Sequence, residues 1–290
     1  MTVLEKWDDF EDGVRRVILE QLDDMDRASV DDAGLVHALR LSCKKIRAWL
    51  RLLRDALGDE AFKSENRIFR DLSRRLSVQR DADVLHESVE SLRDAFPGEA
   101  HAGDISAARS ALPDVTPENG NIASVLADVA VIAADARQRI AELPLERRDR
   151  KAALKQAYRK SCRREKKARR AARDLTADNL HEWRKQVKAL YYQIQLVRDV
   201  WPKRIRRLGA RLKTLAKTLG HHHDLAVLEE QLLASHMPLP PQRLQSIRKL
   251  IHHRLEAEGN KAVRQGRKVS RASCGNFTKG LARRWKTWAG

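Results

Sequence analysis

The sequence has few aromatic residues, few cysteines and no long hydrophobic run. Only 14 of its 290 residues are Phe, Trp or Tyr, so few rings are available for stacking on nucleobases. Its three cysteines, Cys43, Cys162 and Cys274, have no Cys-x-x-Cys spacing, which predicts a reducing, cytoplasmic location. No stretch approaches 18 consecutive apolar residues, so we expect no membrane span. The first residues lack a basic segment followed by an apolar one, so we expect no secretory signal.

The sequence has an excess of positive charge, and this charge is unevenly distributed. There are 58 Lys and Arg against 40 Asp and Glu, a net charge of +18. Residues 1–145 hold 20 basic and 28 acidic residues, whereas residues 146–290 hold 38 basic and 12 acidic residues. A balance this basic indicates a polyanionic partner.

Helix-forming residues dominate the chain, and apolar residues recur at steps of three and four, which predicts an all-α fold. Prolines and glycines over 96–120 predict a loop there, and further breaks are expected at 220–223 and near Pro240. The expected helices cover 4–26, 34–57, 60–78, 82–95, 121–142, 147–173, 178–200, 203–219, 224–235, 241–268 and 276–288.

Two sequence matches at nearly the same offset indicate an internal repeat. The segment His37-Ala-Leu-Arg40 corresponds to His181-Glu-Trp-Arg184 at an offset of 144. The segment beginning at Asp81 corresponds to the one beginning at Asp224 at an offset of 143. We interpret the chain as a tandem duplication of residues 1–142 and 143–290, with the two copies packed about an approximate two-fold axis.

The repeated segment predicts a helix with an apolar seam and, one position further along, a line of basic residues. The seam of the first copy is Val36, Leu39, Cys43, Ile46, Leu50, Leu53 and Leu57. The first basic stripe is His37, Arg40, Lys44, Arg47, Arg51 and Arg54. The second basic stripe is His181, Arg184, Lys188, Tyr191, Gln195 and Arg198, with Lys185 beside it.

A charged helix face is usually a solvated mixture of both signs, but these two stripes lie in acid-free segments. Residues 33–54, 183–198 and 200–223 contain no Asp or Glu. Like charges at helical spacing repel by a few tenths of a kcal/mol per pair, so about 1–2 kcal/mol accumulates along the first stripe. A bound anion would offset this repulsion. Basic residues at related positions extend the candidate site: Arg15, Arg16, Arg70, Arg74, Arg159, Arg163, Lys213 and Lys217.

The segment 147–173 carries 14 basic residues among 27, and three interpretations of it remain open. It is a solvated helix, a nonspecific nucleic-acid surface, or part of the same anion site as the stripes.

The pattern His-x-x-Arg-x-x-x-(Lys/Arg), present twice on predicted helices, resembles the CHAD family, a helical domain named for its histidines. The resemblance implies two bundles of about four core helices each, related by a pseudo-two-fold axis, with a basic central groove or pore. It further implies binding of inorganic polyphosphate by His37, Arg40, Lys44, Arg47, His181, Arg184 and Lys188, and association with polyphosphate granules. Sulfate or phosphate would be expected at the same place in a crystal. The second copy departs from the pattern, because it has His223-Asp224 at the place where the first copy has Arg80-Asp81. We expect the domain to stand alone.

The remaining candidates for chemistry have simpler interpretations. Three adjacent histidines, His221 to His223, point in different directions on a helix, so a helix junction or an extra phosphate contact is favoured over a metal site. Asp81 and Asp224 are interpreted as helix caps, and the alternative is that they hold arginines of the basic stripes in place through ion pairs. No phosphate loop, nucleophile motif or metal-binding carboxylate cluster is present, so we expect no enzyme activity, no cofactor and no metal. Nonspecific nucleic-acid binding remains the alternative function.

Overall fold

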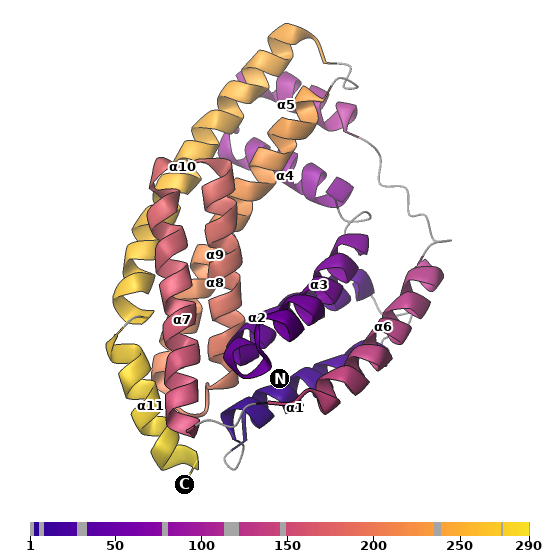
Figure 1. Cartoon of the computed structure of the whole chain (residues 1–290). Coiled ribbons are helices and arrows are strands. Elements are labelled where there is room, and N and C mark those ends of the chain that lie inside the picture. Colours follow the sequence, from indigo (N-terminus) through magenta and orange to yellow (C-terminus); the bar gives the residue numbers. More distant parts are fainter. Residues whose placement is uncertain are drawn as a thin grey trace.

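A computed structural model shows a protein built from helices (Figure 1). It describes residues 3–5, 9–27, 34–76, 81–112, 122–145, 149–234, 239–273 and 275–289. The described residues contain no strand, which confirms the predicted all-α class. The helices are α1 (Phe10–Asp26), α2 (Leu35–Leu57), α3 (Asp59–Arg75), α4 (Asp81–Ala95), α5 (Glu99–Ala111), α6 (Ile122–Glu142), α7 (Arg150–Ala171), α8 (Ala177–Leu196), α9 (Pro202–Leu233), α10 (Pro241–Ser273) and α11 (Asn276–Ala289), with a 3-10 turn η1 (Ala172–Asp174) after α7.

The predicted apolar seam determines how α2 packs. Leu39, Cys43, Ile46 and Leu50 are each at most 2 % exposed, because they point into the main core. The helix follows Gly34 and stops at Gly58, two glycines with positive φ, a backbone conformation that glycine adopts without steric cost. The packing of the seam leaves the first basic stripe on the flank of the helix.

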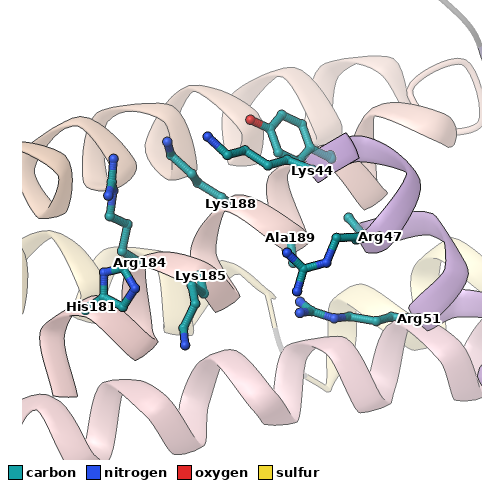
Figure 2. A pocket seen from close by; sticks show the side chains of 10 residues that line it. Lys44, Arg47, Arg51, His181, Arg184, Lys185, Lys188 and Ala189 are labelled. Atoms are coloured by element: carbon teal, nitrogen blue, oxygen red, sulfur yellow. The ribbon is translucent and has the colours of Figure 1, made fainter. Parts of the chain in front are cut away.

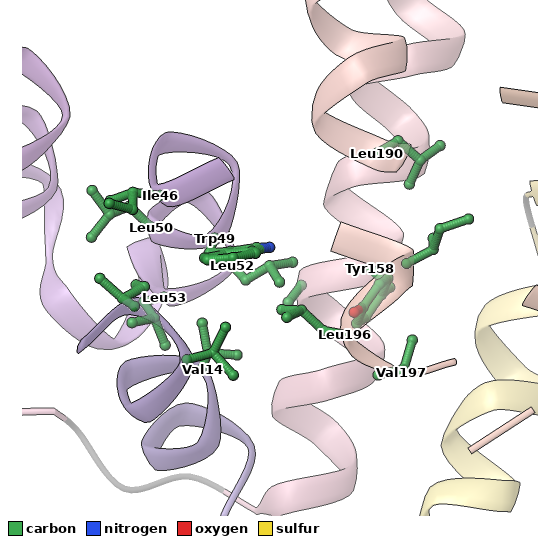
Figure 3. Packing of buried hydrophobic residues seen from close by; sticks show 14 of the residues in the cluster. Val14, Ile46, Trp49, Leu50, Leu52, Leu53, Tyr158, Leu190, Leu196 and Val197 are labelled. Carbon is green, nitrogen blue, oxygen red and sulfur yellow. The ribbon is translucent and has the colours of Figure 1, made fainter. Parts of the chain in front are cut away.

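Two hydrophobic clusters hold the helices together, and each draws on both halves of the sequence. The larger cluster joins α1, α2, α3 and α6 to α7, α8, the first half of α9, the second half of α10 and α11. Figure 3 shows part of it, where Val14, Trp49 and Leu53 face Tyr158, Leu196 and Val197. The smaller cluster joins α4 and α5 to the second half of α9 and the first half of α10.

The structure corrects the expected loop over 96–120, because Glu99–Ala111 forms the helix α5. Pro97 and Gly98 lie just before this helix and do not interrupt it. Its buried residues Ile105 and Ala108 belong to the smaller cluster, so tertiary packing stabilises a segment whose composition predicts a loop. Residues 113–121 lie outside the described part of the chain.

The expected break at 220–223 is also wrong, because α9 runs without interruption from Pro202 to Leu233. Gly220 and His222 are buried within it, and Asp224 therefore lies inside a helix rather than capping one. Asp81 begins α4, but its side chain lies outside the described residues. The first helix begins at Phe10 rather than near residue 4, where Leu4 is buried and donates its backbone N–H to the carbonyl of Leu196 (3.0 Å).

Candidate functional site

The candidate site forms where α2 crosses α8. Trp49 Nε1 donates to the carbonyl oxygen of Tyr192 (3.2 Å), and Gln193 Nε2 donates to the carbonyl oxygen of Ala48 (2.7 Å). At the repeat offset of 144, Ala48 corresponds to Tyr192 and Trp49 corresponds to Gln193. In each bond, therefore, the side chain of one copy donates to the backbone of the other copy, at equivalent positions. This reciprocity is what a local two-fold relation would produce at the crossing. A two-fold relation over the whole chain stays a prediction.

Beside the crossing lies a cavity of about 220 Å³ with a cationic lining (Figure 2). The lining includes six Lys and Arg side chains and no acidic side chain. The crossing angle brings the C-terminal part of the first stripe against the N-terminal part of the second, so the two stripes do not meet along their full length. The lining residues are Lys44, Arg47, Ala48, Arg51, His181, Arg184, Lys185, Lys188, Ala189 and Tyr192.

The α2 side of the cavity holds arginines whose charge is unfavourable. Burial, together with the positive charges of Arg47 and Arg164, lowers the pKa of Arg51 to about 10. Burial also lowers the pKa of Arg47, as do the charges of Arg70 and Arg74 on α3. Arg51 stays protonated at pH 7. One carboxylate acts nearby, because Glu182 forms an ion pair with Lys185 (2.5 Å) and its charge raises the pKa of Arg51. One acidic side chain therefore offsets only part of the positive charge of the lining.

Hydrogen bonds to neutral groups fix two arginines of the first stripe. Arg47 Nε donates to Asn66 Oδ1 of α3 (3.1 Å), and Arg40 donates to the carbonyl oxygen of Leu76 at the end of α3 (3.4 Å). These partners orient the guanidinium groups without cancelling their charge. The helix α3 therefore supports the cationic side of the site.

On the α8 side, Arg184 and Lys188 point toward α9 in Figure 2. Arg184 lies against the backbone of α9 at Gly220, where an added Cβ would sit 3.8 Å from Nε. His181 lies beside it, and its Nδ1 is 3.2 Å from Nδ1 of His223. Burial lowers the pKa of His223 to about 3, helped by the charges of Arg184 and His181. Burial and the charges of Lys185 and Arg184 also lower the pKa of His181, so one neutral imidazole donates to the other at pH 7.

The rest of the second stripe lines a separate cavity of about 500 Å³ between α8 and the start of α9. Lys213 lies in this lining, whereas Lys217 is exposed one turn further along α9. Four cationic side chains and one carboxylate are among the lining residues, which are Tyr191, Gln195, Arg198, Asp199, Pro202, Lys203, Ile205, Arg206, Gly209, Ala210 and Lys213.

Several predicted site residues lie away from the first cavity. Arg15 donates to the carbonyl oxygens of Ala141 and Leu143 at the end of α6, and Arg16 pairs with Glu20 (2.5 Å). These two residues fasten α1, so the structure does not place them in the cavity lining.

Six more of the predicted residues are also outside the lining. Two of them interact with α3 or its end, because Arg40 donates to the carbonyl oxygen of Leu76 and Arg74 lies 3.9 Å from Asp71. His37 is exposed in the first turn of α2. Arg70 pairs with Asp71 (2.9 Å), and Arg159 and Arg163 are exposed on the side of α7 that faces solvent.

Three residues near the cavity were not among the predicted site residues. Arg164, on the flank of α7, is close enough to Arg51 to lower its pKa. Tyr192 contributes the one aromatic ring of the lining. His223 contacts His181 because α9 continues through the histidine run. The histidine run was the one sequence signal available, and the expected break in the helix obscured it.

These features define a class of protein, a helical domain with a cationic cavity where two matching helices cross. A comparison with protein families matches the CHAD domain over residues 5–233, and the chain belongs to this family. A search of curated proteins finds no match. The matched region contains the cavity, whereas α10 and α11 follow it.

Two features are absent from the residues that the structure describes. No helix among them is long and apolar enough to cross a membrane. They also contain no group of three or more His, Cys, Asp or Glu side chains arranged to hold a metal ion.

Proposed function

We propose that the cavity at the crossing of α2 and α8 binds inorganic polyphosphate without catalysing a reaction on it. The observation that carries this proposal is the lining itself, in which six cationic side chains from two helices meet with no carboxylate among them. Guanidinium forks and ammonium groups are the side chains best suited to phosphate oxygens. Membership of the CHAD family supports the same ligand class.

The size of the cavity favours a thin chain over a nucleic acid. A volume of about 220 Å³ equals that of about seven water molecules at about 30 Å³ each, which suits a short run of phosphate groups and excludes a duplex. The lining offers one ring, Tyr192, for stacking, whereas single-stranded nucleic acids are usually held by several rings.

Burial of cations and their mutual repulsion supply the driving force. Arg47 and Arg51 lie one turn apart on α2, and burial, with the charges of nearby arginines, lowers the pKa of each. A polyanion relieves this repulsion on binding. Affinity should therefore fall as salt concentration rises, as it does for other ligands bound through many phosphates.

The test compares two variants with the same change in charge. The cavity variant carries Lys44→Gln, Arg184→Gln and Lys188→Gln. The control carries Arg159→Gln, Arg163→Gln and Lys167→Gln on the solvent face of α7. Because each lost charge-assisted hydrogen bond is worth about 1.5–3 kcal/mol, the cavity variant should bind labelled polyphosphate at least 10²-fold more weakly.

The control should bind polyphosphate within about threefold of the wild-type affinity. Equal losses in both variants would show that binding depends on net charge and not on the cavity. A cavity variant with unchanged affinity and an unchanged unfolding midpoint would overturn the proposal. Incubation of the wild type with polyphosphate and Mg²⁺ should release no orthophosphate, and sustained release would contradict the non-catalytic assignment.

A further inference from the structure

The solvent face of α7 carries a line of basic side chains separate from the cavity. They follow one another at steps of four, four, four, four and three residues and are all exposed. At about 1.5 Å per residue, the line extends over about 28 Å of the helix axis, and because each step of four residues adds about 40°, it winds about 160° around the helix between Lys151 and Lys167. We name it the outer basic stripe, and its members are Lys151, Lys155, Arg159, Arg163, Lys167 and Arg170.

No member of the outer basic stripe forms an ion pair or a hydrogen bond with the part of the chain that the structure describes. Other cations of α7 do have such partners. Lys160 pairs with Asp55 of α2 (2.5 Å), and Arg169 donates to Ser270 of α10 (2.7 Å). The one acidic residue of α7, Glu165, is completely buried. The cations that fasten α7 to its neighbours are therefore distinct from those that face solvent.

The helices that contact α7 also carry exposed basic residues. The helix α7 contacts both α11 and α10, and α11 runs beside α7 in Figure 1. The sequence contains no Asp or Glu from residue 259 to residue 290. The exposed basic residues of this region are Lys261, Arg264, Arg267, Lys268, Lys279, Arg283, Arg284 and Lys286.

We propose that the outer basic stripe binds the phosphate backbone of double-stranded DNA at a site independent of the cavity. A duplex carries one charge per about 1.7 Å of axis, so about 16 phosphates lie alongside a stripe of this length. A rigid duplex can contact a broad, exposed helical surface, whereas a thin flexible chain gains more from a concave site lined by two helices. The one aromatic residue of α7, Tyr158, is fully buried, so this helix offers no ring for stacking on the bases of a single strand.

If both proposals hold, one molecule would bind polyphosphate in its cavity and DNA on α7 at the same time. The two sites face different directions on α7, because Arg164 and Lys160 lie toward α2 whereas Arg159 and Arg163 lie toward solvent. The DNA site does not require the proposed function of the cavity, and either one can fail without the other.

The experiment measures binding of a labelled 30-base-pair duplex between about 0.05 and 0.3 M salt. Five or six phosphate contacts predict a slope of log K against log salt of about −4.5 to −5.4. The variant with Arg159→Gln, Arg163→Gln and Lys167→Gln loses three contacts. Its slope should become shallower by about 2.7, and its affinity near 0.1 M salt should fall on the order of 10²-fold.

The cavity variant with Lys44→Gln, Arg184→Gln and Lys188→Gln is the matched control, and it should keep both the affinity and the slope for DNA. A loss of DNA binding in this variant, with none in the α7 variant, would place DNA in the cavity and overturn the proposal. A short polyphosphate added at one equivalent should leave DNA bound to the wild type.

Two further outcomes would assign the stripe to another polyanion. If long-chain polyphosphate displaces DNA from the cavity variant at matched phosphate concentration, the stripe is a second polyphosphate surface. If vesicles containing anionic lipid bind through the same three residues and the duplex does not, the stripe is a membrane surface. Both results would overturn the assignment to DNA.

Discussion

Replacing Arg51 by Met should make the unliganded protein more stable and its complex with polyphosphate weaker. The Met side chain keeps an unbranched apolar stem of similar reach but removes the charge next to Arg47 and Arg164. The pKa of Arg51 falls from 12.5 to about 10. At 1.36 kcal/mol per unit, this shift represents about 3 kcal/mol by which the folded state disfavours the protonated form.

The sign of the effect follows from the direction of the shift. Because the pKa is lower in the folded state than in the unfolded state, charged Arg51 destabilises the fold at any pH below about 10. Removing the charge at pH 7 should raise the free energy of unfolding by about 1–3 kcal/mol, the upper value being the full shift. Chemical denaturation with and without polyphosphate measures both effects, and stabilisation by polyphosphate should be smaller in the variant.

The matched control is Arg159→Met on the exposed face of α7, where the unfolding free energy should change by less than about 0.5 kcal/mol. A drop of 1 kcal/mol or more in Arg51→Met would refute the reasoning. Such a drop would mean that a favourable contact of the guanidinium group outweighs its burial beside two other cations.

Three further outcomes are expected. Adding sulfate should raise the melting temperature more than chloride at equal ionic strength, because a divalent anion offsets the cavity charge, and the difference should shrink in the variant with Lys44→Gln, Arg184→Gln and Lys188→Gln. Polyphosphate should bind more tightly as the pH falls below 7, because the anion raises the lowered pKa values of His181 and His223. Calorimetry at pH 6 in two buffers of different ionisation enthalpy should reveal proton uptake on binding. Equal binding enthalpies in the two buffers would contradict this prediction. Gly266→Ala should cost about 1–3 kcal/mol of stability, since its Cβ would overlap the buried ring of Trp183; an unchanged unfolding midpoint would show that the ring can move.

The local features of the site could be predicted from the sequence because they depend on helical periodicity. The seam that contains Leu39 and Leu50 is buried, and the stripe one position further along reaches the cavity through Lys44, Arg47 and Arg51. A period of 3.6 residues relates these positions wherever the helix lies.

The features that could not be predicted depend on contacts between distant segments. The point at which α2 crosses α8 decides that Arg51 and Lys185 line the same cavity while His37 stays outside the lining. Periodicity separates Arg164 from Arg163 by about 100°, but it does not reveal which of them faces α2. The continuity of α9 through Gly220 depends on packing against Arg184 and α8, to which local composition gives no guide.

Because α9 is a single long helix, the two predicted copies cannot be expressed as separate fragments without exposing apolar surface. Its first half belongs to one hydrophobic cluster and its second half to the other, where it covers α4 and α5. Cutting the gene between the two predicted copies would separate α4 and α5 from the surface that shields their apolar side chains. A fragment ending at residue 142 should therefore aggregate, and a designer who wants a smaller scaffold should shorten the loops between helices and keep both copies in one polypeptide.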